Sequence, residues 1–174
     1  MTCSNVFALS NEYSNYDPSK FQYSNDAIKF SVCFNDNWDI YYSYTTMLAD
    51  IQNFVKPINP ANFLYFGMTK NKLLGCRGLV EEVNMDLGDY FAILKDVNAK
   101  AISNFSEKNI KINHTPMIYW TYETSGNQFF FAEYIFKKGN YDVRLSFWTL
   151  KSLFNKYSKE FDNIMKTFTV EENM

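Results

Sequence analysis

Few side chains in this chain could carry out catalysis. His114 is the only histidine, and an imidazole can activate a thiol such as Cys33 or Cys76 as a nucleophile. No nucleophile motif surrounds these residues, and their spacing gives no reason to expect contact between them. We therefore interpret His114 as a loop residue before a strand. The sequence predicts no catalytic residue and no cofactor, and we expect a protein that is not an enzyme.

The carboxylates Glu81, Glu82, Asp86 and Asp89 form the main candidate for a metal site. Glu81 and Glu82 are neighbours on an expected strand, so their side chains point to opposite faces. Calcium would require closely spaced oxygens in a loop that contains glycine. Carboxylates at the start of a helix instead stabilise its positive end. We predict helix capping and a solvated edge here, and no metal site.

The three cysteines do not indicate a zinc or redox site. Cys33 and Cys76 have neither a CxxC arrangement nor zinc-ligand spacing, and they could form a disulfide only if their strands are neighbours. Cys3 precedes a polar stretch over residues 10–24. This arrangement resembles a bacterial lipoprotein that keeps an acylated cysteine and a flexible tether after its signal is removed. The alternative is a chance cysteine near a frayed terminus, since Thr2 is unusual before a lipidated cysteine.

Composition limits the partners. The chain has 174 residues, of which 47% are hydrophobic, and a formal net charge of −2. This charge gives no reason to expect nucleic acid or an anionic membrane surface as a partner. No apolar run approaches the ~20 residues of a membrane span, so we expect membrane attachment only through a lipid at Cys3. That attachment would place the protein in the cell envelope, and the alternative is the cytoplasm.

Hydrophobic periodicity predicts an order of strands and helices. Residues 1–22 are expected to form a polar leader, 23–170 a single domain, and 171–174 a tail. The expected strands are residues 28–34, 38–44, 62–69, 73–83, 117–123, 128–136 and 141–147. The expected helices are residues 47–55, 87–105 and 153–168. Short turns join the strands in pairs, which requires antiparallel pairing with helices on at least one face. The predicted fold class is α+β, with an antiparallel sheet and packing helices.

The strongest candidate for a binding surface is aromatic. The two expected strands over residues 117–123 and 128–136 are apolar on both faces. If helices cover both faces, these side chains are core, and we favour this interpretation. If only one face is covered, an exposed patch remains that could dock a protein or an apolar ligand. Trp120, Tyr122 and Trp148 are the residues that we expect in such a patch.

This order of elements resembles the PsbP/Mog1-like fold over residues 23–170. The resemblance rests on the opening strand Phe30–Phe34, a strand that begins at Trp38, a long middle helix, the aromatic meander and a closing helix that ends in Thr167-Phe168-Thr169. The family pattern has a proline before the tryptophan, whereas this chain has Asn35-Asp36-Asn37. The resemblance implies an α/β/α sandwich that acts by binding other macromolecules and has no common catalytic centre.

Two functions remain open at this point. The first is a non-enzymatic interaction domain that binds a protein partner through its sheet or sheet edge, anchored to a membrane if Cys3 is acylated. The alternative is a carrier for a small apolar ligand, with a cavity between the aromatic sheet and the helix expected over residues 87–105.

Overall fold

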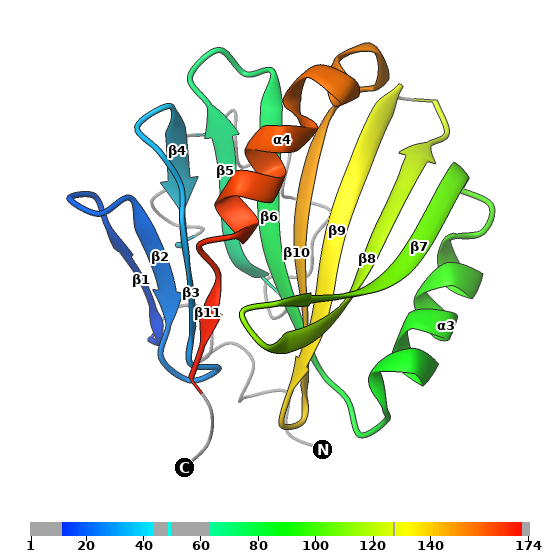
Figure 1. Ribbon diagram of the computed structural model, residues 1–174, viewed down its shortest axis with the longest axis horizontal. Coiled ribbons are helices and arrows are strands. Elements are labelled where there is room, and N and C mark those ends of the chain that lie inside the picture. Colours follow the sequence, from blue (N-terminus) through cyan, green and yellow to red (C-terminus); the bar gives the residue numbers. More distant parts are fainter. Residues whose placement is uncertain (1–11, 44–48, 50–62, 127, 172–174) are drawn as a thin grey trace.

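The computed structural model describes residues 12–43, 49, 63–126 and 128–171 (Figure 1). Within these residues the strands form two antiparallel sheets, one of four strands and one of seven. Two helices, α3 (Leu87–Asn98) and α4 (Phe154–Met165), pack on the larger sheet. The helix expected over residues 47–55 and the lipid attachment expected at Cys3 lie outside the described residues.

The smaller sheet has the strand order β1-β2-β3-β11. Its strands are β1 (Ser14–Asp17), β2 (Gln22–Asn25), β3 (Phe30–Cys33) and β11 (Thr169–Val170). Apolar and polar side chains alternate along its strands, so one face of the sheet packs on the core and the other faces outward. Tyr23 and Val32 are buried in the core, whereas Ser24 and Ser31 lie on the outer face. Residues 14–22 of the expected polar leader therefore belong to the sheet or its first turn. The prediction missed this strand because β1 is only four residues long and mostly polar.

The larger sheet has the strand order β4-β5-β6-β10-β9-β8-β7. Its strands are β4 (Trp38–Tyr41), β5 (Phe63–Thr69), β6 (Leu74–Glu82), β7 (Ile102–Ile112), β8 (Thr115–Thr124), β9 (Phe129–Lys138) and β10 (Tyr141–Leu150). The β9–β10 turn contains Gly139, whose φ of +59° favours glycine. The pairing of β10 with β6 joins the two halves of the chain. The predicted meander is present, with β7 as a further strand.

The two helices cover opposite faces of the larger sheet. Helix α4 (Phe154–Met165), which follows a short 3-10 turn, buries Phe161 in the cluster that holds Phe147 of β10. Helix α3 (Leu87–Asn98) buries Phe91 against Trp120 on the other face. The Asp86 carboxylate accepts a hydrogen bond from the backbone N–H of Asp89 and so caps α3, as the sequence predicted. The α+β class with packing helices is confirmed.

The middle helix is shorter than the prediction. It ends at Asn98, and β7 begins at Ile102, whereas the apolar spacing predicted a helix as far as Phe105. Two members of the expected apolar stripe are exposed, Val97 by 75% and Phe105 by 58%. The sequence prediction was wrong because pairing with β8 supplies backbone hydrogen bonds that outweigh the local helical spacing.

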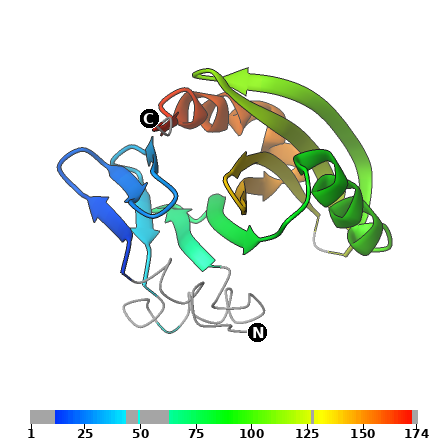
Figure 2. The same ribbon diagram turned by 90° about the horizontal axis from the view of Figure 1, so that it is seen from below.

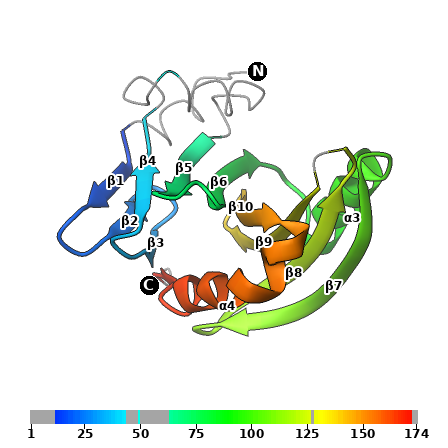
Figure 3. The same cartoon turned by 90° about the horizontal axis from the view of Figure 1, so that it is seen from above.

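The strands curve around a common core (Figures 2 and 3). Helix α4 lies on the open side of this curve, between the small sheet and the end of β7, and Asn113 at the tip of the β7–β8 hairpin donates to the Phe168 carbonyl just beyond α4. This arrangement places the outer edge of β7 beside α4. Among the described residues, no helix is long and apolar enough to cross a membrane.

Candidate functional site

The structure brings the predicted aromatic residues together on the face that α3 partly covers. Trp120 and Tyr122 of β8 have ring centroids 4.5 Å apart, and Phe131 of β9 stacks on both Tyr122 and Trp148. Trp120 is only 1% exposed and Tyr122 only 5%, whereas Trp148 is half-buried. Trp120 and Tyr122 are therefore core residues. This is the interpretation that the sequence favoured, and of the three residues named for the alternative, an exposed patch, only Trp148 is partly exposed.

A buried ionic cluster lies beside these rings, and the sequence analysis did not find it. Glu133 of β9 is fully buried. Its carboxylate accepts hydrogen bonds from Arg144 (3.0 and 3.1 Å), Ser146 (2.8 Å) and the hydroxyl of Tyr122 (3.1 Å). Arg77 of β6 adds an ion pair at 3.9 Å. The sequence signal for this cluster was the charged residue Glu133 within the otherwise apolar run of β9, together with Arg144 on the neighbouring strand β10.

Strand register explains why these groups meet. Ser146 of β10 lies directly opposite Glu133 of β9 on one side and Arg77 of β6 on the other. Directly opposed residues in an antiparallel pair have Cβ atoms about 5 Å apart. A shift of one residue would turn every one of these side chains to the other face. The cluster therefore fixes the register of three central strands.

The cluster is electrostatically satisfied at its centre. Burial opposes ionisation of Glu133, but Arg144, Arg77 and the hydrogen bonds outweigh it, so the pKa of Glu133 lies below its ordinary value. Burial also opposes the charge on Arg144, yet Glu133 raises the pKa of Arg144 above its ordinary value. Both groups are thus charged and paired at neutral pH. A carboxylate that is inaccessible and fully paired has no means of acting on a substrate.

Arg77 and Trp148 form the partly exposed rim of the cluster. The Arg77 guanidinium carbon lies 5.7 Å from the Phe131 ring centroid and 6.0 Å from the Trp148 centroid, a cation–π arrangement. Trp148 also lies flat over Gly75, where an added Cβ would come within 2.3 Å of the indole. Glycine at this position therefore allows the indole to pack on the strand.

The Gly75→Ala variant is expected to displace Trp148. The added methyl group leaves no space for the indole, and overpacking of this kind typically costs about 1–3 kcal/mol. Trp38 and Trp120 are buried elsewhere, so a red shift in tryptophan fluorescence would report Trp148 moving toward solvent. Gly88→Ala at the exposed start of α3 is the matched control and should leave the emission unchanged. An unchanged emission in Gly75→Ala would contradict this packing.

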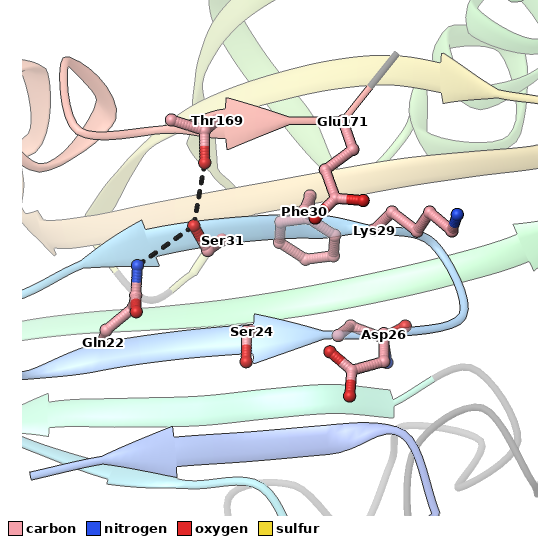
Figure 4. Close-up of a pocket in the computed structure, with 9 residues that line it drawn as sticks. Gln22, Ser24, Asp26, Lys29, Phe30, Ser31, Thr169 and Glu171 are labelled. Atoms are coloured by element: carbon pink, nitrogen blue, oxygen red, sulfur yellow. Dashed lines mark hydrogen bonds between the residues drawn. The ribbon is translucent and has the colours of Figure 1, made fainter. Parts of the chain in front are cut away.

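A polar hollow of about 430 Å³ lies on the outer face of the smaller sheet (Figure 4). At one end, Gln22 donates to the Ser31 hydroxyl at 3.2 Å, and Ser31 lies 2.9 Å from the Thr169 hydroxyl. The carboxylates of Asp26 and Glu171 lie at the other end, together with the positively charged Lys29. Gln22, Ser31 and Thr169 bond to one another, and the charged side chains of the lining carry both signs of charge. The hollow therefore does not select one class of ligand.

Strand β7 presents the longest unpaired edge among the described strands. It has 11 residues and ends the larger sheet, with β8 as its only partner in the described chain. The other end strands are shorter: β1 and β4 have four residues each and β11 has two. Residues 103–109 are all exposed. Proteins usually keep edge strands short, because a free edge is a template for pairing with another chain.

The turn after β7 determines which backbone groups face this edge. Asn113 and His114 both have positive φ (45° and 68°), as in the type I′ turn of a two-residue hairpin. The residues that flank such a turn, Ile112 and Thr115, form a hydrogen-bonded pair. His114, predicted as a loop residue before a strand, lies exposed in this turn.

Hydrogen-bonded and non-hydrogen-bonded pairs alternate along an antiparallel ladder. Counting back from Ile112, the backbone N–H and C=O groups of Glu107, Asn109 and Lys111 point to the free edge. Lys111 lies opposite Pro116 of β8. This agrees with a non-hydrogen-bonded pair at this position, because proline has no N–H to donate to Lys111. The free edge thus offers a regular row of donors and acceptors.

A groove of about 270 Å³ lies between β7 and α4. Its floor includes Tyr119 and Tyr134, whose ring centroids are 4.9 Å apart. Tyr134 donates to the Asp162 carboxylate of α4 at 2.8 Å. Burial raises the pKa of Tyr119 to about 12, with a smaller contribution from Asp162. The hydroxyl of Tyr119 is therefore neutral at physiological pH.

The cysteines do not form a site. Cys33 and Cys76 are both free thiols. Cys33 lies in β3 of the smaller sheet and Cys76 in β6 of the larger one, so their strands are not neighbours. Burial raises the pKa of the Cys76 thiol well above its ordinary value, which disfavours the reactive thiolate. Among the described residues, no group of His, Cys, Asp or Glu could hold a metal ion.

Comparison with known proteins identifies the fold. No family model matches the sequence, and no curated protein matches it significantly. The structure is similar to the solution structure of cyanobacterial PsbP from Synechocystis, with a TM-score of 0.60 and 10% identity over 86% of this chain and 91% of that one. The fold is PsbP-like. The predicted resemblance is thus confirmed at the level of the fold.

A second structure with this PsbP-like fold comes from Bacteroides thetaiotaomicron. The TM-score is 0.52 and the identity 14%, over 87% of this chain and 48% of that one. The present chain therefore spans about half the length of the Bacteroides protein. At such identities the similarity concerns the fold alone, and a fold does not specify a function. Function must be argued from the surface of this PsbP-like chain.

Proposed function

We propose that this PsbP-like protein is a non-enzymatic interaction domain that binds an extended segment of a protein partner along the free edge of β7. The observation that carries the proposal is the contrast between this exposed strand of 11 residues and the short strands at the other sheet edges. An added strand gains its affinity from main-chain hydrogen bonds. The outward backbone groups of Glu107, Asn109 and Lys111 would supply them.

The chemistry of the described residues supports a binding role over a catalytic one. Glu133 and Arg144, two buried charged groups, pair with each other and so are not available to a substrate. His114 is exposed at the tip of a hairpin, and the buried Cys76 is held as a thiol. No acid, base and nucleophile converge on one accessible point in this part of the chain.

The packing of α3 gives no support to the carrier alternative. That alternative needs a cavity between the aromatic sheet and the helix after residue 87. Phe91 of α3 packs edge-on against Trp120 with ring centroids 5.2 Å apart, and Tyr90 and Leu94 are buried in the same cluster. Side chains therefore occupy the interface where a ligand was expected.

The Asn109→Pro variant tests strand addition. Proline removes the outward N–H at the centre of the edge, while the β7–β8 ladder is kept because Asn109 is not hydrogen-bonded to β8. Asn109→Ala is the matched control, since it keeps the N–H and removes only an exposed side chain. Proteins from the source cells that bind immobilised wild-type protein should be retained by Asn109→Ala and lost with Asn109→Pro. Equal retention by both variants would overturn strand addition at β7.

Membrane attachment is a separate proposal. It rests on Cys3 in the sequence alone, because residues 14–24 of the polar stretch that follows belong to the smaller sheet and its first turn. An acylated cysteine would hold the interaction domain at a membrane surface in the cell envelope. A single acyl chain binds a membrane only weakly, so stable anchoring needs a second membrane-binding signal. Mass spectrometry of the N-terminal peptide from the native membrane fraction would detect a lipid on Cys3. An unmodified peptide would refute the anchor and leave the β7 proposal unchanged.

A further inference from the structure

We infer that the segment recognised by β7 is acidic and inserts an apolar side chain into the groove between β7 and α4. This inference rests on the proposed function and specifies its partner. It follows from the position of the groove, the nature of its floor and the charges at its rim.

The groove lies on the path of an added strand. Figures 1 and 3 show β7 running beside α4, and the groove is lined by residues of both elements. A strand added to β7 would lie about 4.8 Å from it, and its side chains would alternate between the two faces. Every second side chain of the partner would therefore project on the face that contains the groove.

The floor of the groove suits one apolar side chain. Ile110 and Ile112 of β7, Tyr119 of β8 and Met165 of α4 line it. Its volume of about 270 Å³ is below the range of roughly 300–1,000 Å³ that is typical of small-molecule sites. The groove therefore fits a side chain of an extended peptide better than a free ligand. Burial of that side chain would add selectivity to the main-chain hydrogen bonds.

The rim of the groove is basic. Lys108 of β7 lies with its Nζ 5.0 Å from the Tyr119 ring centroid, and Lys166 lines the groove from the C-terminal end of α4. Lys111 is exposed on the same strand. Of the nearby carboxylates, Glu107 pairs with Lys95 at 2.9 Å. Asp162 accepts from Tyr134 but keeps its charge, so two lysines and one aspartate line the groove.

The ammonium groups of Lys108 and Lys166 thus line the groove, whereas Lys111 points to the other face of β7. Complementary charge favours an acidic segment and disfavours basic ones. Lysines on an edge strand also discourage unwanted pairing. The two roles are compatible, since the same charges that repel a general strand attract one rich in carboxylates.

The test uses three synthetic peptides of nine residues, labelled with fluorescein. All three carry one valine at position 5 and threonine at positions 2, 4, 6 and 8. Positions 1, 3, 7 and 9, which lie on the same face as the valine, are glutamate, glutamine or lysine. Binding to the full chain is measured by fluorescence anisotropy. The glutamate peptide should bind about threefold to tenfold more tightly than the glutamine peptide, as expected for a few exposed ion pairs. The lysine peptide should bind most weakly, and the differences should shrink at high salt.

Charge reversal on the protein provides the matched comparison. A double variant with Lys108→Glu and Lys166→Glu should reverse the order of the glutamate and lysine peptides, and it changes only side chains on the rim. Ile110→Ser should weaken all three peptides to a similar degree. Asn109→Pro should abolish binding of every peptide, whereas Asn109→Ala should not.

The outcomes separate this inference from the proposed function. Equal affinity for the glutamate and glutamine peptides, with both lost in Asn109→Pro, would overturn the acidic partner and leave strand addition intact. If the peptides bind Asn109→Pro as tightly as they bind the wild-type protein, strand addition itself would be overturned. Sedimentation of the free protein as a dimer that Asn109→Pro dissociates would show that a second copy occupies the edge, and would also overturn the inference.

Discussion

The Glu133→Ala variant is expected to lose about 3–5 kcal/mol of its free energy of unfolding. The side chain is fully buried and accepts hydrogen bonds from Arg144, Ser146 and Tyr122. Alanine would leave the Arg144 guanidinium in the core without a counter-charge. A buried charge that loses its partner is strongly destabilising, because its desolvation is no longer compensated. Urea denaturation would measure the loss as a lower midpoint at an unchanged slope.

An exposed ion pair between α3 and the same sheet is the matched control. Lys95 of α3 and Glu107 of β7 pair at 2.9 Å, and both side chains are more than a third exposed. Exposed pairs typically contribute no more than about 1 kcal/mol, so Glu107→Ala should change stability little. A similar small change for Glu133→Ala would contradict the view that the buried cluster holds the three central strands in register.

The cluster also predicts a dependence of stability on pH. The pKa of Glu133 in the folded protein lies below its ordinary value, despite burial, because Arg144 and Arg77 favour the carboxylate. The corresponding stability is present above the unfolded-state pKa of about 4.3 and is lost as the pH falls through the folded-state pKa. Wild-type protein should therefore lose stability in this acidic range. Glu133→Gln should lack this component and show a flatter profile.

Local patterns in the sequence predicted much of the fold. Alternation over residues 141–147 predicted the buried face of β10, where Val143, Leu145 and Phe147 are fully buried. The short turn between the strands expected over residues 128–136 and 141–147 predicted the β9–β10 hairpin, and helical spacing after residue 153 predicted α4. These elements depend on neighbours that are close in sequence, so their signals are local.

The features that the sequence did not predict depend on contacts between residues far apart in the chain. Pairing of β10 with β6 brings Arg77 to Ser146, a contact between residues far apart in the chain. This pairing adds Arg77 to the ionic cluster, whose other charged pair, Glu133 and Arg144, meets across the β9–β10 hairpin. Pairing with β8 likewise converted residues 102–105 from the expected helix to the start of β7. The candidate edge therefore depended on a strand whose local pattern favoured a helix.

The Trp120→Ala variant is expected to lose about 3–5 kcal/mol of stability, as is typical when a large aromatic side chain is removed from a core. Trp120 is 1% exposed. Its ring packs edge-on against Phe91 of α3 and lies 4.5 Å from the Tyr122 ring, measured between centroids. Alanine would leave a cavity between α3 and the sheet, and the surrounding side chains could fill it only in part.

Two further substitutions separate packing from other roles of the indole. The indole N–H of Trp120 has no hydrogen-bond partner among the described residues. Trp120→Phe therefore removes volume without breaking a hydrogen bond of this part of the chain and should cost much less than alanine. Trp148 is half-buried, and Trp148→Ala should cost a smaller amount, of about 1–2 kcal/mol. Chemical denaturation of the three variants would give this order of stability.

The order of stability of these variants also distinguishes a core residue from a docking residue. A docking residue loses binding when it is truncated but costs little stability, whereas a core residue shows the reverse. If Trp120→Ala were as stable as wild type, Trp120 would belong to a surface, and α3 would not cover it in solution. If it is destabilised as expected, the folded fraction should still bind partners along β7, because Asn109 and the outward backbone groups lie on the strand edge rather than on the face beneath α3.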